Sequence, residues 1–336
     1  MAHEKLKTED TQTPLESLAQ RLDEDMRNVN ELILDRMQSD IPLIPQLAHY
    51  LIASGGKRIR PLLTLASARL FSETDTRSYK LASAVEFIHT ATLLHDDVVD
   101  ESDKRRGKDS ANIVFGNQAS VLVGDFLFSR AFELMVESGS LDVLRVLSHA
   151  SSVIAEGEVL QLSLQYNLDT SLEQYKQVIA AKTAALFAAA TEVGAIITGQ
   201  NHKLQKAMRD YGFHLGMAFQ IADDILDYEG SAKALGKNIG DDFKDGKMSA
   251  PVILTLPTLT ATQKSEWENL FGKQEIADAD LDRMITLVRT SGALEKCRSL
   301  AETHIQSATD SLENITESSL KTLLKNLAHF ALARQS

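Results

Sequence analysis

Apolar stretches rich in helix-forming residues alternate along the chain with short polar stretches. Four polar stretches mark breaks in this pattern, at residues 71–78, 101–110, 137–140 and 167–171. The intervals between them have lengths suited to helices packed in a bundle. These intervals lack the β-branched alternation that is typical of strands. The pattern therefore predicts an all-α fold.

The distribution of proline strengthens this prediction. Proline breaks helix interiors because it lacks an N–H group and its ring clashes with the preceding turn. Residues 62–250 contain no proline and are rich in Ala, Leu, Glu, Gln and Met, which are good helix formers. No linker divides the chain, so we predict a polar N-terminal extension at residues 1–20 and a single all-helical domain at residues 21–336.

The first of two acidic clusters ends a largely apolar predicted helix. Only one formal charge lies between Lys80 and Asp96, and Asp97 and Asp100 follow directly. On an ideal helix Asp96 and Asp100 share a face, with Cβ atoms about 5–6 Å apart. A helix C-terminus already carries partial negative charge, so buried carboxylates there need a partner. Ligation by oxygen alone favours Mg²⁺ or Mn²⁺.

The same arrangement recurs later in the chain. Residues 211–222 carry no formal charge, and Asp223, Asp224 and Asp227 then follow, with Gln220 on the face shared by Asp224 and Asp227. One acidic cluster alone is more often a solvated helix end. Two clusters that each end an apolar helix favour a paired metal site. Because Mg²⁺ binds through one or two carboxylates plus substrate phosphates, such a site predicts a polyanionic substrate.

Basic residues gather near these clusters. Lys57, Arg58 and Arg60 follow two glycines that let the backbone approach a ligand, and a second basic cluster lies at residues 104–106. Each alone is more often an ordinary solvated loop. Beside a metal site both predict phosphate binding.

Two further polar positions interrupt apolar helices. Lys182 and Thr183 lie in an Ala-rich helix, where Lys182 either extends to the surface or points inward and needs an anion. His89 alone is more often a buried core histidine. Because it shares a helix face with Asp96 and Asp100, we predict that it contacts phosphate.

Composition narrows the possible partners. The chain has 47 acidic and 35 basic residues and a formal net charge of −12, which argues against nucleic acid as a partner. The single cysteine, Cys297, excludes an intrachain disulfide and suits a reducing compartment, so we expect a cytoplasmic protein. No uninterrupted apolar run approaches the roughly 18 residues of a membrane span. We expect at most peripheral membrane contact.

With these motifs in place, the sequence resembles the trans-isoprenyl diphosphate synthases, and most closely their long-chain bacterial polyprenyl (octaprenyl to decaprenyl) members. The likeness covers about residues 20–330. It rests on a series of motifs in the family's order: GGKRIRP, HTATLLHDDVVDESDKRRG, GDFLFSRAF, AEGEVLQL, KTAALF, QIADDILD and GKNIGDDFKDGK.

The resemblance implies a helical bundle around a deep central cavity with Mg²⁺ at its mouth, and a homodimer. It assigns isopentenyl diphosphate to Lys57, Arg60, His89 and Arg106. It assigns the allylic diphosphate to Arg105 and to the catalytic residues Lys182, Thr183, Gln220 and Lys237. It assigns the metals to Asp96, Asp100, Asp223 and Asp227, with Asp97 and Asp224 as nearer support or water-mediated ligands.

The implied reaction is ionisation of an allylic diphosphate, attack by isopentenyl diphosphate and loss of a proton. It needs no nucleophilic side chain but must exclude water, for which the segment 229–250 is a candidate lid. The resemblance makes Ala91 and Thr92 the chain-length residues, and both are small, which favours a long product destined for a quinone side chain.

Two alternatives remain at this stage. A geranylgeranyl diphosphate synthase would make a shorter product with the same motifs. A non-catalytic regulatory subunit of a heteromeric synthase would share the fold, although such subunits typically lose aspartates that this chain keeps. The two residues between Asp97 and Asp100 differ from the four of bacterial farnesyl diphosphate synthases. Beside Lys247, Met248 and Ala250 stand where the family more often shows Thr or Pro and then Leu.

Overall fold

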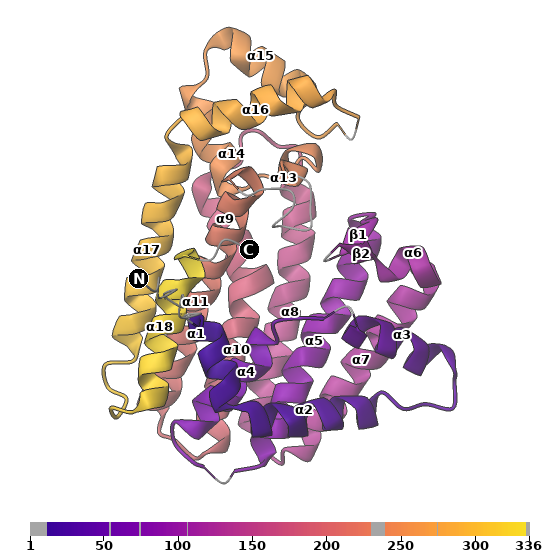
Figure 1. The fold of residues 1–336 in the computed structure, drawn as a ribbon, viewed down its shortest axis with the longest axis vertical. Helices are drawn as coiled ribbons and strands as arrows, with labels where there is room; N and C mark the ends of the chain where they lie inside the picture. The colour runs from indigo at the N-terminus through magenta and orange to yellow at the C-terminus, as the bar shows by residue number, and fades with distance from the viewer. Residues whose placement is uncertain are drawn as a thin grey trace, which may run out of the picture.

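A computed structural model describes residues 12–333 apart from 54, 74, 106, 230–238 and 274, and it describes no side chains at 52 and 53. The fold is all-α, as predicted (Figure 1). The α-helices are α1 (Pro14–Arg21), α2 (Asp23–Arg36), α3 (Leu43–Ala53), α4 (Ile59–Arg69), α5 (Arg77–Val99), α6 (Ala111–Phe115), α7 (Asn117–Glu137), α8 (Leu141–Leu164), α9 (Leu172–Ile179), α10 (Ala185–Ile197), α11 (His202–Glu229), α13 (Asp241–Lys244), α14 (Ala250–Thr255), α15 (Ala261–Leu270), α16 (Asp278–Thr290), α17 (Ala293–Ser311) and α18 (Ser319–Ala333). A π-helical turn (Ala180–Ala184) joins α9 to α10, and a 3₁₀ turn (Leu256–Thr258) follows α14.

The predicted breaks are confirmed, with one addition. Helices end or begin within a few residues of each of the four polar stretches. The stretch at 101–110 also contains the strands of a small antiparallel pair, β1 (Lys104–Arg105) and β2 (Lys108–Asp109). Two residues per strand are too few to show the alternation by which a strand is recognised in a sequence.

The folded part of the chain starts earlier than the predicted boundary at residue 21. Helix α1 begins at Pro14, and Thr13 and Glu16 form a capping box at its start. Leu18 is fully buried in the core, and α1 packs against α18. Residues 14–20 are therefore part of the bundle and not of a polar extension, because one buried leucine anchors an otherwise polar helix.

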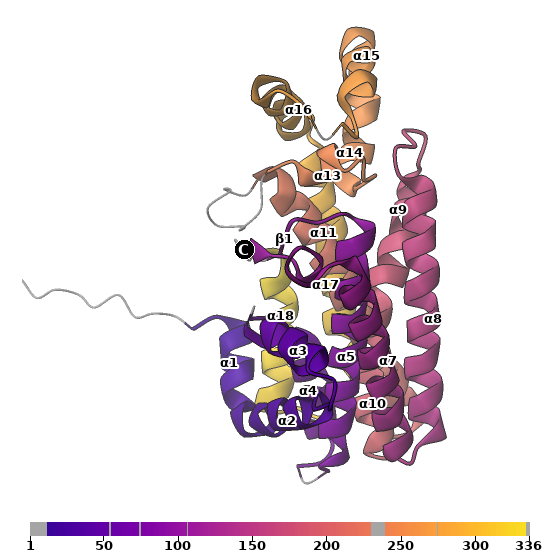
Figure 2. The ribbon, with the colours of Figure 1, turned by 90° about the vertical axis from the view of Figure 1, so that its right-hand side faces the viewer.

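Two hydrophobic cores support the bundle. The larger one unites α1, α2, α4, α5, α7, α8, α10 and α18, and the smaller one lies among α13–α17 and the C-terminal part of α11. Figures 1 and 2 show α15 and α16 at one end of the molecule and α2 at the other. Cys297 is buried in the smaller core, where burial raises the pKa of its thiol to about 12 and keeps it unreactive at neutral pH.

Close packing of α10 against α11 fixes the centre of the bundle. Gly212 on α11 faces the backbone of α10, and a Cβ atom there would lie 2.3 Å from the carbonyl oxygen of Phe187. Gly216, one turn later, comes similarly close to Ala184. The two glycines let α11 approach the helix that carries Lys182, so its C-terminal aspartates are delivered beside that lysine.

One segment is long and apolar enough to cross a membrane by length and composition. It runs from Leu172 to Ile197, through α9, the π turn and α10. In its most apolar window 67% of the residues are buried inside the fold. Burial of this kind is typical of a core helix.

A histidine pair lies between α11 and α17. The Nδ1 atoms of His214 and His304 are 2.9 Å apart, and the two rings pack against each other. Burial lowers the pKa of both imidazoles, and the neighbouring His214 helps to bring the pKa of His304 to about 4. The pair is therefore neutral at physiological pH.

This pair makes stability depend on pH. A histidine titrates near pH 6.5 in the unfolded chain, so between about pH 6.5 and 4 the unfolded state binds more protons and stability falls as the pH falls. We expect His304→Asn to reduce this acid-induced loss, measured as the free energy of unfolding in urea at pH 7 and pH 4.5. His329→Asn, at an exposed position on α18, is the control. Equal pH dependence in all three proteins would contradict the prediction.

Candidate active site

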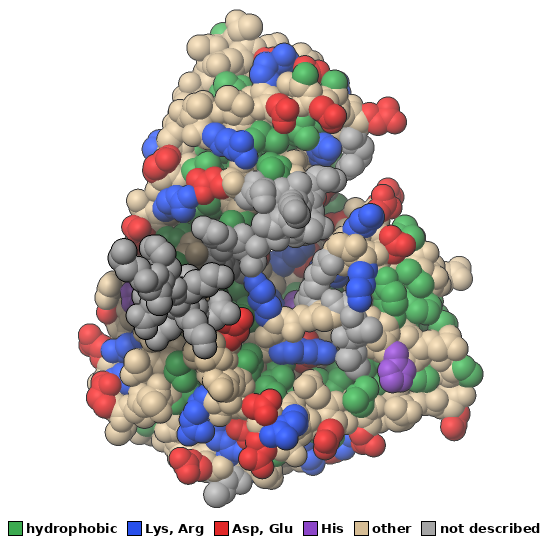
Figure 3. Space-filling model, viewed as in Figure 1, with side chains coloured by type: hydrophobic (Ala, Val, Ile, Leu, Met, Phe, Trp, Pro, Cys, Tyr) green, Lys and Arg blue, Asp and Glu red, His purple; other side chains and the backbone are tan. Residues whose placement is uncertain are grey.

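A cavity of about 480 Å³ opens where the C-terminal ends of α5 and α11 meet residues 242–249. Its volume is in the usual range for small-molecule sites. Figure 3 shows a hollow in this face of the molecule with Lys and Arg side chains around it. The structure brings together most residues that the sequence singled out: Lys57, Arg60, His89, Thr92, Asp96, Asp100, Arg105, Lys182, Thr183, Gln220 and Asp223.

Four of the predicted site residues are placed differently or not described. Arg106 and Lys237 lie outside the described residues. Ala91 is fully buried in the larger core and does not line the cavity. Asp227 does not line the cavity either; its carboxylate accepts a hydrogen bond from the backbone N–H of Asp242 at 3.2 Å, which ties the end of α11 to α13.

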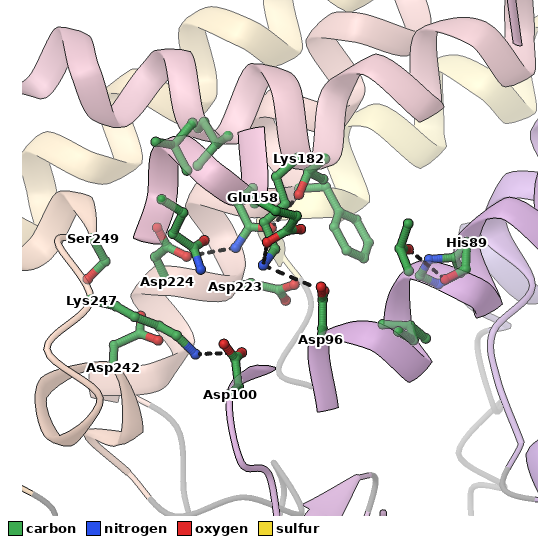
Figure 4. Close-up of a pocket in the computed structure, with 18 of the residues that line it drawn as sticks. His89, Asp96, Asp100, Glu158, Lys182, Asp223, Asp224, Asp242, Lys247 and Ser249 are labelled. Carbon is green, nitrogen blue, oxygen red and sulfur yellow. Dashed lines mark hydrogen bonds and ion pairs between the residues drawn. The ribbon is translucent and has the colours of Figure 1, made fainter. Parts of the chain in front are cut away.

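Lysines compensate the charge of the first aspartate cluster (Figure 4). Lys182 Nζ lies 2.6 Å from Glu158 Oε2 and 3.6 Å from Asp96 Oδ2. Burial raises the pKa of Asp96, and Lys182 opposes that rise. Burial would lower the pKa of Lys182, but Asp96 and Glu158 outweigh it and the pKa is raised. Lys182 therefore points inward as a charged group, and does not extend to the surface.

A second lysine performs the same task at the neighbouring carboxylate. Lys247 Nζ lies 3.3 Å from Asp100 Oδ2 and 3.0 Å from Asp245 Oδ2. Its neighbours Met248 and Ala250, which depart from the family's pattern, are both buried in the smaller hydrophobic core.

Asp97 points away from the cavity and orients a cation. It is 2% exposed, and Arg105 binds it with Nε at 2.8 Å and Nη2 at 2.6 Å from Oδ1. This pair holds Arg105 at the cavity wall. Arg60 Nη1 lies 3.0 Å from His89 Nε2, and the Arg60 guanidinium packs over the ring of Phe187.

The second aspartate cluster belongs to a chain of side-chain hydrogen bonds. Asp224 is buried and accepts hydrogen bonds from the Tyr175 hydroxyl at 2.6 Å and the Gln220 amide at 2.9 Å. The Thr183 hydroxyl donates to Gln220 Oε1 at 2.8 Å. Burial raises the pKa of Asp224 to about 8. Asp224 thus fixes the orientation of Gln220 and Thr183, while Asp223 lines the cavity.

The donor atoms fit a hard divalent cation that brings further ligands with it. Asp96, Asp100 and Asp223 offer only carboxylate oxygens to the cavity, the chemistry that Mg²⁺ prefers. Within the described part of the chain, no three acidic, His or Cys side chains meet closely enough to form a complete metal site. A cation here needs water or substrate phosphate to complete its coordination.

Lys182 and Thr183 lie in a π-helical turn that the sequence did not reveal. Both residues line the cavity. The π turn packs against α8, where a Cβ atom added at Gly157 would lie only 2.6 Å from that of Ala181. Such single turns are frequent at functional sites. Its Ala-rich residues favour α-helix, so no local signal distinguishes the two forms.

Several polar cavity residues escaped the sequence prediction, among them Glu158, Asp242 and Ser249 (Figure 4). Glu158 lies within the AEGEVLQL motif, where its spacing from Lys182 gives no hint of contact. Asp242 belongs to the GKNIGDDFKDGK motif, where it forms a third acidic pair with Asp241. Its sequence position does not indicate that it lies near either aspartate cluster.

The turn that carries Lys247 is held by an unusual contact. Tyr166 has a positive φ of 63°, and its backbone N–H donates to the Gly246 carbonyl oxygen at 2.9 Å. Its ring covers Gly246, where a Cβ atom would lie 2.2 Å from Tyr166 Cδ1. Gly246 itself has a φ of 65°, a conformation that favours glycine.

We expect Gly246→Ala to displace this turn and separate Lys247 from Asp100. The variant should lose about 1–3 kcal/mol of unfolding free energy through overpacking, in addition to backbone strain. Gly139→Ala is the matched control, because Gly139 has a φ of 72° and nothing lies within 4 Å of its Cβ position. Urea denaturation compares the two. Equal losses would show that the Tyr166 contact does not constrain the turn.

Comparison with known proteins agrees with this geometry. The family model described as Polyprenyl synthetase matches residues 41–288. The octaprenyl diphosphate synthase of Escherichia coli is 43% identical over 320 residues, covering 95% of this chain and 99% of the relative. The crystal structure of a polyprenyl synthase from Caulobacter crescentus, complexed with calcium and isoprenyl diphosphate, has 49% identity and a TM-score of 0.93, covering 97% and 99% of the two chains. A decaprenyl diphosphate synthase from Rhodobacter capsulatus has 47% identity and a TM-score of 0.91, covering 96% and 100%. The chain belongs to the polyprenyl synthetase family and is a prenyltransferase.

Proposed function

We propose that this prenyltransferase is a long-chain all-trans polyprenyl diphosphate synthase that makes products from octaprenyl to decaprenyl diphosphate. The observation that carries the proposal is the cavity itself, where Asp96, Asp100 and Asp223 face two lysines and a row of further cationic side chains. The Escherichia coli and Rhodobacter capsulatus relatives, named octaprenyl and decaprenyl synthases, support the long product. A quinone is the acceptor class that we propose for it.

The diphosphate of the allylic substrate is best accommodated beside the aspartates. Mg²⁺ held by Asp96, Asp100 and Asp223 would neutralise the charge that develops on the departing diphosphate. Lys182 and Gln220 lie at the same wall and would donate to its oxygens, while Thr183 donates to Gln220 Oε1 and helps to orient the amide. Because Asp224 and Tyr175 fix the Gln220 amide, this donor is oriented before substrate binds.

A second diphosphate suits the opposite wall. Lys57, Arg60 and His89 line the cavity there, and the Arg60–His89 contact holds both side chains in place. Isopentenyl diphosphate bound at this wall would direct its double bond toward the allylic carbon. Val178, Ile179 and Phe219 supply apolar wall in the same cavity. Such a wall excludes water from the allylic cation.

We also propose that the protein is a homodimer. Helices α7 and α8 expose large apolar side chains: Leu122 (67%), Val136 (64%), Val159 (69%) and Leu162 (59%). Exposed apolar surface of this kind is typical of protein–protein interfaces.

Product sizing tests the proposed reaction. Purified protein incubated with Mg²⁺, isopentenyl diphosphate and farnesyl diphosphate should yield octaprenyl to decaprenyl diphosphate, and Asp96→Asn should lower the rate by at least about 100-fold because one carboxylate of the metal site is lost. Products no longer than geranylgeranyl diphosphate would favour the shorter-chain alternative. Activity that requires a partner chain would favour the regulatory subunit.

Product length should respond to the size of residue 92. Thr92 lines the cavity one turn before Asp96, so Thr92→Phe should place a ring in the path of the growing chain and shorten the product while ionisation continues. Ala91→Phe tests the other chain-length residue that the family resemblance names, although Ala91 lies in the core. Chromatography of the products measures both. Unchanged chain length in the Thr92 variant would contradict the prediction.

A further inference from the structure

Each of the two lysines at the first aspartate cluster lies between two carboxylates. Lys182 contacts Asp96 at 3.6 Å and Glu158 at 2.6 Å. Lys247 contacts Asp100 at 3.3 Å and Asp245 at 3.0 Å. For Lys182 the much nearer carboxylate is Glu158, which lies outside the proposed metal-binding set, whereas Lys247 donates hydrogen bonds to both Asp100 and Asp245.

This arrangement matters because an ammonium group and a divalent cation compete for the same carboxylate. An ammonium has three donors and forms short, charge-assisted bonds to carboxylate oxygens. If Lys182 closed fully on Asp96, a metal would have to break that bond before it could bind. The side chains of Lys182, Glu158 and Asp96 are 25%, 28% and 17% exposed, so solvent weakens this competition only in part.

We propose that Glu158 is a positioning residue that holds Lys182 back from Asp96 and so keeps Asp96 available to a divalent cation. The inference rests on the proposed function, since it takes Asp96 and Asp100 as metal-binding carboxylates. It adds a role for α8, which carries Glu158 and supplies none of the proposed metal ligands.

Replacement of Glu158 separates this role from a merely structural one. In Glu158→Gln the amide is no longer an anion, so Lys182 should move onto Asp96 and metal should bind more weakly. A structural ion pair would lower stability but leave the metal affinity unchanged. Glu156→Gln is the control, because Glu156 is exposed on the same helix, two residues earlier.

Mn²⁺ binding measures the effect without turnover. Titration of the full-length protein with Mn²⁺, followed by the EPR signal of the free ion, should show at least about a threefold weaker affinity for Glu158→Gln and no change for Glu156→Gln. The Mg²⁺ concentration for half-maximal activity should rise by a similar factor, with kcat at saturating Mg²⁺ within about twofold of wild type. Glu158→Asp should restore most of the affinity.

A double-mutant cycle identifies Lys182 as the route. In a Lys182→Met background there is no ammonium to restrain, so adding Glu158→Gln should leave Mn²⁺ affinity unchanged. Persistence of the threefold loss in that background would show that Glu158 acts only through its general negative charge, and would overturn the inference. An unchanged or higher metal affinity in the single variant would also overturn it.

Failure of the proposed function has a different signature. Wild-type protein would then bind Mn²⁺ but form no polyprenyl diphosphate. The Mn²⁺ titrations of the single and double variants still decide the role of Glu158 in that case, because they do not depend on product formation.

Discussion

Repulsion among carboxylates at the ends of α5 and α11 is the constraint on which the rest of the site depends. Asp96, Asp100 and Asp223 share one half-buried cavity, and the buried Asp224 lies at its wall. The low dielectric there strengthens their repulsion. The protein answers it with cations from distant parts of the chain, Lys182 beyond α8 and Lys247 beyond α13. When the segments that carry these two lysines pack into the bundle, their charges also compensate the carboxylates of the site. The packing of the bundle and the charge balance of the site therefore depend on each other.

The fold delivers these groups through close helix contacts. Glycines at 212 and 216 bring α11 against α10, and Gly157 brings α8 against the π turn. Helices α8, α10 and α11 therefore pack closely around the turn that carries Lys182. The second hydrophobic core, around α13 to α17, supports the segment that carries Asp242 and Lys247. Residues of the smaller core, such as Tyr175, Ile179 and Met248, also line the cavity.

The sequence predicted the parts of this site that depend on local periodicity. Asp96 and Asp100 are one turn apart, so their shared face followed from helix geometry alone, and the breaks between helices followed from polar composition. It could not predict contacts that depend on how helices dock. Three contacts are of this kind: the ion pair of Lys182 with Glu158, the ion pair of Asp97 with Arg105, and the hydrogen bond from the backbone of Asp242 to Asp227. Leu18 misled the boundary prediction because a single buried side chain scarcely alters the polarity of its segment.

The π turn at Ala180–Ala184 has a consequence for how this chain tolerates a change of length. A π turn takes up one residue more than regular helix would, and it does so locally, so the buried faces of α9 and α10 keep the phase that their neighbours require. Deletion of one residue there would convert the turn to α-helix and leave both faces matched. The change would fall on Lys182 and Thr183, because the turn sets the directions in which these two side chains leave the helix. A change of chain length at this point would therefore alter the cavity wall before it altered the packing of α9 or α10.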